Sequence, residues 1–497
     1  MSSNGILDEQ KLDALFPAPS LPPSPWCPQR LPGSNGKSLA ALQHVLKSNH
    51  KRHHVFMNYI RFHNHITHRA LALYALGGDA SIIKDYYEQD AKNQRAAFDS
   101  PEAITEENFV EHVGDENYYQ AYVAFFTKQI DEKGAAKTLE EYIFSEKYNF
   151  QKRRAAESQP EMLFRLVDGL LHPMIHVGYG LEFGIKGMLA EGLAMSTGHH
   201  VSARGFHPPT LFTPAEVDSV EEATSSLSSL SLNTQLRLST HSKTSGVHVF
   251  DILARMLKDD EFKTTPPKTL ADTFPRTLSA YASKISKYAE EWTIDLSQPG
   301  EIERKMEEVI WMSSLMYAVG GFDKVKGFQA NFFLMHMVTS SLFLPSLIAY
   351  LSSRSQVILL RAYLTTVLVW WVAVGRPALD VKSFMTAAPT PRTLASTKSN
   401  GTTPSPMEIP NPFLPIIQSA IIHPNDHVSK IHRAFAHFDT LYGTKPAGYF
   451  KGTELEGAEF LDGSLFLRGA VLTADALGWD KESQESKAFS FEGFYTV

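Results

Sequence analysis

Apolar residues recur at spacings of three and four through most of the chain, the pattern that places them on one face of a helix. Runs of alternating apolar and polar residues between turn dipeptides, which would predict hairpins, do not occur, and no repeat of fixed period is present. We therefore expect an all-α protein, a mostly helical single large domain. Helices are predicted at residues 39–76, 82–98, 117–130, 163–195, 247–256, 302–319 and 330–351.

Three stretches are too rich in proline, serine or threonine for helix interiors. Residues 17–36 are proline-rich, so residues 1–37 are predicted to form an extended Pro-rich N-terminal arm. Residues 218–246 and 386–412 predict two flexible insertions, because loops of such length are uncommon inside a compact domain. The helical domain is expected to cover residues 38–490.

The most apolar run, residues 362–375, has 14 residues, fewer than the roughly 20 that a membrane-spanning helix needs. Its paired Trp370 and Trp371 favour a buried core helix. The start of the chain lacks a signal-peptide pattern, and its end lacks the retention, peroxisomal and prenylation tails. We expect no integral membrane segment and a soluble, intracellular, cytoplasmic protein, with peripheral membrane contact left open.

Composition narrows the function classes. The chain is 43% hydrophobic, which is ordinary for a folded protein, and its net charge of -7 argues against nucleic-acid binding. One cysteine, Cys27, excludes an intrachain disulfide, a zinc ribbon and an iron–sulfur cluster. The unusual feature is the number of histidines, 20 in 497 residues.

The first group of histidines lies between His44 and His68. If this region is one helix, a polar stripe runs along it in steps of three or four residues. Such a stripe lines a polar cavity or a metal site, or else it is a solvated helix face. The stripe consists of His50, His54, Asn58, Arg61, His65 and His68.

The second group is the pair His172 and His176, whose spacing of four allows two imidazoles on a helix to share one metal. Pro173 predicts that a helix begins or restarts at His172. Asp168 is a candidate for orienting a histidine through its second ring nitrogen. Because this spacing also arises by chance, the pair alone does not establish a site.

Two further places carry candidates. His336 is a lone imidazole in an aromatic, methionine-rich stretch and by itself is typical of a satisfied core histidine. His427 lies three residues before Lys430 in a segment where Asn425 or Asp426 would cap a helix, and a solvated surface is the alternative there.

Several cofactor motifs are missing from the sequence. It has no G-x-G-x-x-G after a strand, no P-loop, no G-x-S-x-G and no H-E-x-x-H. A flavin- or nicotinamide-binding Rossmann domain is therefore not expected. If the protein performs redox chemistry, its electrons come from the substrate, a metal or a donor bound in another way.

The residues resemble a known family. Residues 62–71, followed by residues 74–78, resemble the N-terminal signature of fungal questin oxidase-like proteins, and three later blocks follow in the same order. The later blocks are residues 172–183, residues 336–341 and the helix of residues 427–434. The resemblance covers most of residues 38–490 and skips the two insertions.

This resemblance implies a Baeyer–Villiger-type oxidase of aromatic polyketides, an oxidoreductase that inserts oxygen into a questin- or versicolorin-like anthraquinone and opens its ring. It implies NADPH and O2, in fungal secondary metabolism and mycotoxin biosynthesis. The long chain with its insertions is more similar to the aflatoxin and sterigmatocystin branch. Some relatives use a His-rich mononuclear metal site.

Without a flavin domain, the substrate itself can activate oxygen. A reduced anthraquinone deprotonated by histidine can pass an electron to O2, and the resulting peroxide then inserts oxygen beside a carbonyl. NADPH would reduce the quinone, with a pathway reductase as a partner. The catalytic candidates are His65, His68, His172, His176 and Arg61. The candidates for binding the planar aromatic polyketide are Tyr118, Tyr122, Phe126 and Tyr179, for which packing is the alternative role.

Other functions stay open at this stage. In one variant a mononuclear iron, or another metal that histidine suits, makes the protein a dioxygenase. A non-catalytic helical polyketide-binding protein is an alternative from a different class, and a metal-dependent phosphohydrolase is disfavoured because aspartate is scarce near the histidines. The metal ligands would come from His68, His172, His176, His336, His427 and a modified Lys430.

Overall fold

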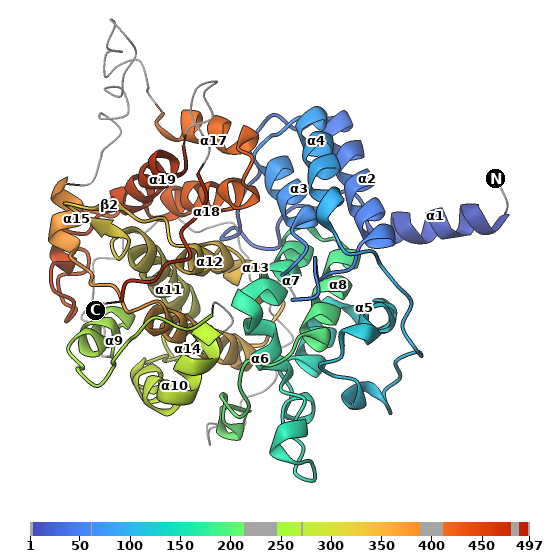
Figure 1. Ribbon diagram of the computed structural model, residues 1–497, viewed down its shortest axis with the longest axis horizontal. Helices are drawn as coiled ribbons and strands as arrows, with labels where there is room; N and C mark the ends of the chain where they lie inside the picture. Colours follow the sequence, from blue (N-terminus) through green and yellow to red (C-terminus); the bar gives the residue numbers. More distant parts are fainter. Residues whose placement is uncertain are drawn as a thin grey trace, which may run out of the picture.

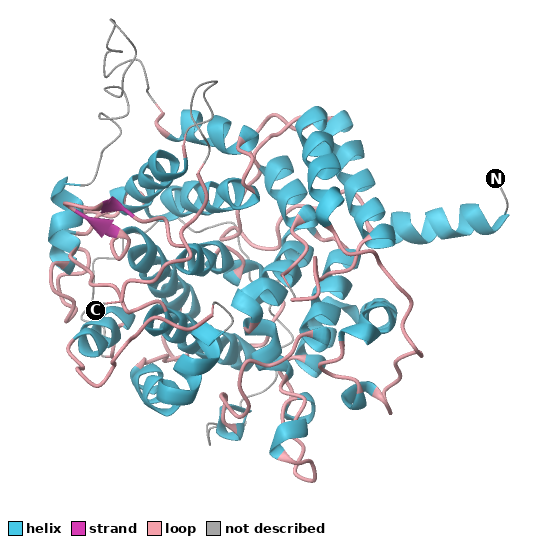
Figure 2. Ribbon diagram, viewed as in Figure 1, coloured by secondary structure: helices cyan, strands magenta, loops and turns pink. Residues whose placement is uncertain are grey.

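The computed structural model is mostly helical, which confirms the predicted fold class (Figure 2). In the described part of the chain, the sheet is one short antiparallel hairpin of β1 (Phe322–Asp323) and β2 (Gly327–Phe328). The predicted insertions, 218–246 and 386–412, lie outside the described residues except at their ends. The structure describes residues 3–60, 62–212, 246–269, 272–387, 411–478 and 487–495.

The connections between the α-helices range in length from two residues, at 184–185, to more than twenty, as at 91–118. The first half of the chain contains α1 (Ser3–Leu15), α2 (Gly36–Arg52), α3 (Ile66–Ala75), α4 (Ala80–Asp90), α5 (Tyr119–Tyr142), α6 (Met162–Val167), α7 (His172–Phe183), α8 (Lys186–Gly198) and α9 (Val249–Leu257). The second half contains α10 (Thr273–Glu291), α11 (Glu301–Ala318), α12 (Phe332–Ser341), α13 (Leu344–Ile348), α14 (Ser353–Ala373), α15 (Val381–Ala387), α17 (Phe413–Ile422), α18 (Asp426–Tyr442) and α19 (Ser464–Leu477).

Four of these helices pack in a closed ring near the middle of the molecule (Figure 1). Helix α3 contacts α7, α7 contacts α12, α12 contacts α18, and α18 returns to α3. Asparagine side chains define three of the helix starts, because Asn64, Asn331 and Asn425 each accept a hydrogen bond from a backbone N–H of the first turn. The ring therefore brings together segments that are distant in the sequence.

Helix α14 contains the apolar run and extends it to 21 residues, because Ser352 caps a start upstream of the run. It is the one helix in the described ranges that is long and apolar enough to cross a membrane. In its most apolar window, 83% of the residues are buried inside the protein, as expected for a core helix. The fold gives no indication of an integral membrane segment.

The N-terminal arm differs from the prediction over residues 3–15, which form helix α1 instead of extended chain. This part of the arm has no proline, and Leu12 and Phe16 bury their side chains in the core. Lys47 of α2 also pairs with Glu9 and Asp13 of α1. The extended chain begins at Pro17, where the prolines begin.

The single helix predicted for residues 39–76 is also wrong. Helix α2 ends at Arg52 and α3 begins at Ile66, with a loop between them. In the loop, Asn58 Oδ1 accepts hydrogen bonds from the backbone N–H groups of Ile60 and Phe62, which competes with helix formation. The predicted polar stripe does not exist as one helix face.

Candidate functional site

The helix predicted to begin at His172 does begin there, with Pro173 in its first turn. The turn before it is strained, because Leu170 and Leu171 have φ values of 55° and 64°. Left-handed backbone at such residues costs on the order of 1–3 kcal/mol each and is typical of functional sites. The turn places the Gly169 carbonyl 2.8 Å from His172 Nδ1 and so orients that ring.

Histidines from all four ring helices line one small inner cavity. Its volume of about 10 Å³ leaves room for about one water-sized molecule. Each of these histidines lies in the first two turns of its helix. The lining consists of His68, His172, Ile175, Tyr179, His336, Thr339, Leu342, Phe343, His427 and Lys430.

The Nδ1 atoms of three of the four cavity histidines are anchored by hydrogen bonds. His172 Nδ1 donates to the Gly169 carbonyl, and His336 Nδ1 donates to the Phe332 carbonyl, at 2.8 Å each. His427 Nδ1 donates to a carboxylate oxygen of Asp426 at 3.0 Å. These acceptors assign the proton to Nδ1 and leave a lone pair on Nε2, the arrangement found in metal-binding histidines.

His65 joins this set through both of its ring nitrogens. Its Nδ1 lies 2.8 Å from Asp426 Oδ2, and its Nε2 lies 2.8 Å from His172 Nε2. Because the Nδ1 atoms of both rings already donate, the two Nε2 atoms must share an added proton or a cation. Within the described ranges, the group of side chains close enough to hold a metal ion is His65, Asp426 and His427.

A second chain of hydrogen bonds runs behind the cavity. His68 Nε2 lies 3.0 Å from His176 Nδ1, and His176 Nε2 lies 3.2 Å from Glu191. The other Glu191 oxygen accepts from His50 Nδ1 at 2.7 Å. His176 therefore supports His68 and does not line the cavity beside His172.

Burial sets the charge state of the site. Desolvation lowers the pKa of His427 to about 3, so this imidazole is neutral at pH 7 and its Nε2 can accept a proton. Burial also lowers the pKa of Lys430. For Asp426 burial acts to raise the pKa, but His427, Lys430 and His65 outweigh it and hold the pKa well below the usual range. Desolvation is also the main reason why the pKa lies well below its ordinary value at His63, His68, His172 and His336.

A larger outer pocket opens next to the inner cavity. Its volume of about 310 Å³ falls in the range of small-molecule sites, and His427 lines both spaces. Aromatic rings form much of its wall, and polar groups of the site lie on its inner side. The lining consists of Met57, Phe62, His63, His65, Ile66, Asp90, Asn93, Gln94, Phe332, Asn425, Asp426, His427, Ala488, Phe489 and Phe491.

Of the four predicted aromatic substrate contacts, Tyr179 lies at the site, where its ring stacks on His68. Tyr122 and Phe126 instead pack around Phe109 in a separate core cluster, and Tyr122 donates its hydroxyl to the Phe109 carbonyl. Tyr118 stacks on a surface imidazole at the start of α5. These three line neither cavity, so packing accounts for them.

The remaining predicted residues have different positions. Arg61 lies outside the described residues. Asp168 does not orient a histidine, because its carboxylate accepts hydrogen bonds from Gly169 and Ser202. The carboxylates that do orient imidazoles are Asp426 and Glu191.

Sequence reasoning missed several residues of the site. His63 stacks on His172 at 4.1 Å and on His199 at 5.4 Å, although His199 lies outside the four groups of histidines. Glu191 could have been noticed as a carboxylate in an otherwise apolar helix, since such a group needs a buried partner. Phe332 and Phe491 carry no signal that separates them from core aromatics.

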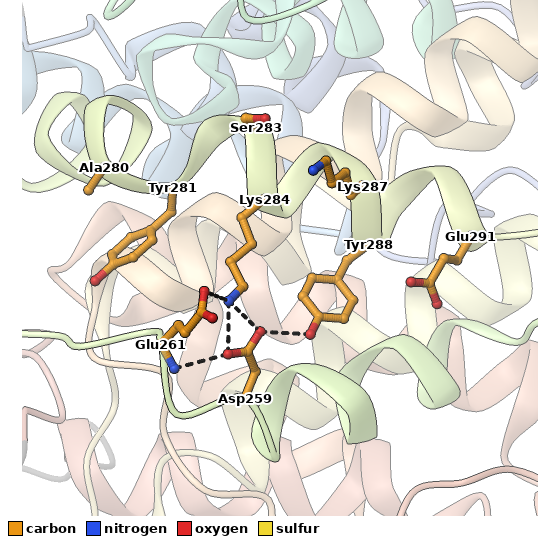
Figure 3. A pocket seen from close by; sticks show the side chains of 9 residues that line it. All are labelled: Asp259, Glu261, Ala280, Tyr281, Ser283, Lys284, Lys287, Tyr288 and Glu291. Carbon is orange, nitrogen blue, oxygen red and sulfur yellow. Dashed lines mark hydrogen bonds and ion pairs between the residues drawn. The ribbon is translucent and has the colours of Figure 1, made fainter.

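A larger hollow, of about 670 Å³, lies on the surface between α9 and α10 (Figure 3). Its charged side chains satisfy one another. Lys284 pairs with Asp259 at 2.7 Å and with Glu261, and Tyr288 donates to Asp259. The described residues that line this hollow include no histidine, unlike those of the histidine site.

Comparisons with known proteins find one family and several relatives that this chain resembles. A family model described as questin oxidase-like matches residues 62–435. A Baeyer–Villiger oxidase of Paecilomyces divaricatus is 27% identical over 354 residues, which are 69% of this chain and 69% of that protein. A questin oxidase of Aspergillus terreus is 27% identical over 71% of this chain and 73% of its own length. A Baeyer–Villiger oxidase of Pestalotiopsis fici is 28% identical over 69% and 71%.

Proposed function

This chain belongs to the questin oxidase-like family, and from that premise we propose that it opens a ring of an anthraquinone-type polyketide by Baeyer–Villiger-type oxygen insertion. Its matched relatives are named as oxidases, and the chain is an oxidoreductase. The observation that carries the proposal is the meeting of an aromatic pocket with a buried imidazole–carboxylate cluster at His427.

The outer pocket fits a flat hydroxylated ring system. Phe62, Phe332 and Phe491 offer aromatic faces, while His65 and Asp426 offer polar partners for hydroxyl and carbonyl groups on the inner edge. The inner cavity, with room for about one water-sized molecule, is too small for such a ring system, and His427 separates it from the outer pocket. We therefore assign the polyketide to the outer pocket and O2 to the inner side of His427.

Proton transfer falls to His427 in this scheme. Its Nε2 is buried and has no hydrogen-bond partner in the described part of the chain, and Asp426 holds its Nδ1. When Nε2 takes a proton from a phenolic hydroxyl, the carboxylate stabilises the resulting imidazolium. The starts of four helices around the cavity stabilise the negative charge of the phenolate and of reduced oxygen.

The stoichiometry of the reaction needs no flavin. The reduced, two-electron form of the substrate reacts with O2, one oxygen atom enters the ring, and the other leaves as water. NADPH supplies the two electrons beforehand by reducing the quinone, through a pathway reductase as partner. We propose that this occurs in the cytoplasm, and the aflatoxin and sterigmatocystin branch stays a prediction.

The same residues also fit a mononuclear metal. Anchored Nδ1 atoms, unpartnered buried Nε2 of His427 and the short Nε2–Nε2 contact of His65 with His172 suit a cation held by nitrogen and oxygen. Among the described residues, His65, Asp426 and His427 are close enough to hold it, and His172, His336, His68 and Lys430 would lie beside them. Iron bound there would supply activation of O2. His176 would support His68 from behind.

The number of oxygen atoms that the product gains from O2 tests the reaction. The protein is incubated anaerobically with a chemically reduced anthraquinone, labelled O2 is admitted, and the product is weighed by mass spectrometry. Gain of one labelled atom is the expected result. Two atoms would indicate dioxygenase cleavage, and none, with no O2 uptake, would indicate a polyketide-binding protein that does no chemistry.

Metal analysis of the purified protein separates the two variants. Stoichiometric iron that a chelator removes together with activity is the result expected for the metal variant. Full activity after chelation, with no bound metal, leaves the metal-free route. Zinc or copper in place of iron would change the metal assignment but keep the ligand set.

A further inference from the structure

The C-terminal segment, residues 487–495, forms one wall of the outer pocket, although it lies beyond the family match of residues 62–435. It is held by its main chain. The Ser490 N–H donates to the Ala330 carbonyl, and the Phe332 N–H donates to the Ser490 carbonyl, at 2.8 Å each. In Figure 1 the segment is the red chain that passes α12 and ends at the C label. Its position therefore does not depend on the side chains that face the pocket.

Phe491 projects from this segment into the pocket. Its ring lies 4.3 Å from that of Phe332, with 28° between the planes. Phe332 in turn lies 4.6 Å from His336 and 5.1 Å from His427. One stacked pair thus connects the outermost wall of the pocket to the imidazoles.

Two large aromatic side chains are left uncovered around this pocket. Phe491 is 39% exposed and Phe62, from the loop after α2, is 42% exposed. Phe489 is buried beneath them and contacts His427. Because exposed apolar surface gains free energy when a ligand covers it, these rings favour binding of a flat apolar molecule.

We propose that residues 487–495 belong to the substrate site and that Phe491, stacked on Phe332, determines how many fused rings the pocket accepts. This rests on the proposed function, which sets the oxygenated edge of the substrate at His427. A two-ring system held there covers Phe332. A third fused ring extends the contact to Phe491.

Binding without turnover tests this. Oxidised dihydroxyanthraquinone, with three rings, and juglone, with two, are titrated against the full chain, and affinity is read from quenching of tryptophan fluorescence. Phe491→Ala should weaken binding of the anthraquinone on the order of 10- to 100-fold, because one face of its outer ring loses its cover. Binding of juglone should change less than about 3-fold. Phe491→Tyr should keep the affinity for both.

Phe460→Ala is the matched control, since Phe460 is similarly exposed, at 38%, and lines neither cavity. If Phe491→Ala lowers the unfolding temperature more than this control does, the titrations are repeated with Phe491→Leu, which removes the aromatic ring but keeps an apolar side chain of similar bulk. Unchanged anthraquinone affinity in a folded variant overturns the inference and leaves the proposed function standing. Equal losses for both probes overturn the assignment of ring number. If the unaltered protein binds neither probe, the proposed substrate class itself is wrong.

Discussion

Two carboxylates organise the histidines, and their surroundings differ. Asp426 contacts His65, whose other ring nitrogen contacts His172. Asp426 also accepts hydrogen bonds from His427 and Lys430. Its side chain is 23% exposed and lines the outer pocket. This carboxylate is therefore in contact with groups that line the two cavities.

Glu191 has the same kind of chain but a different setting. One Glu191 oxygen contacts His176, which in turn contacts His68. The other oxygen accepts a hydrogen bond from His50, which lines a surface hollow. The Glu191 side chain is 4% exposed, and among the described residues no lysine or arginine pairs with it. Asp426 contacts a histidine of the cavity wall, His427, directly, whereas Glu191 reaches the wall residue His68 only through His176.

The comparison separates chemistry from positioning. The Asp426 chain ends on nitrogens that lie between the two cavities, so its charge acts on the reacting groups. The Glu191 chain fixes the orientation of His68, which stacks on Tyr179 in the cavity wall. Removing each carboxylate should therefore have effects of different size.

The largest effect is expected for Asp426→Asn. Lys430 and His65 lose their counter-charge, so kcat should fall on the order of 10²- to 10⁴-fold and stability by about 2–4 kcal/mol. Oxygen uptake and urea unfolding measure the two quantities. Adding Lys430→Met should recover stability without activity, because it removes the unpaired charge. Asp439→Asn, on the same helix but outside both cavities, is the control, and equal losses there would contradict a special role for Asp426.

Glu191→Gln should lower kcat about 10- to 100-fold, as expected for a group that orients another side chain. The variant should also differ from the native protein in how its stability depends on pH below about 4.5. Burial acts to raise the pKa of Glu191, but hydrogen bonds from His176 and His50 hold it at about 2. A depressed carboxyl pKa contributes stability above the unfolded value, about 4.5, and that contribution is lost as the pH falls toward 2. Urea midpoints of the native protein should drop across this window by more than those of the variant; parallel curves would show that the carboxylate is not held in this way.

The smallest effect is expected for His50→Ala. Glu191 keeps its bond to His176, so kcat should fall less than about 10-fold and stability by about 1 kcal/mol. Steady-state oxygen uptake and thermal unfolding measure both. A loss of kcat as large as that of Asp426→Asn would mean that the Glu191 chain takes part in the chemistry and would end the distinction drawn above.

Much of the site was predictable from local patterns. His172 and Pro173 indicated a helix start, and spacing of apolar residues indicated the helix that carries His336. A cap at Asn425 or Asp426 indicated the helix that carries His427. The division of residues 39–76 was not predictable, because periodicity does not register hydrogen bonds such as those of Asn58. Tyr122 and Phe491 show the same limit, since an aromatic residue packs equally well in a core or in a pocket wall.

By itself, the sequence determined the helical class, the family and the groups of histidines in which a site would lie. These depend on local spacing and on residue type, which need no knowledge of distant contacts. Only the tertiary structure decided which carboxylate holds which imidazole, which ring nitrogen stays free, and that residues 488–491 reach the outer pocket. Those features arise where α3, α7, α12 and α18 close into a ring, and such closure is set by packing between segments hundreds of residues apart.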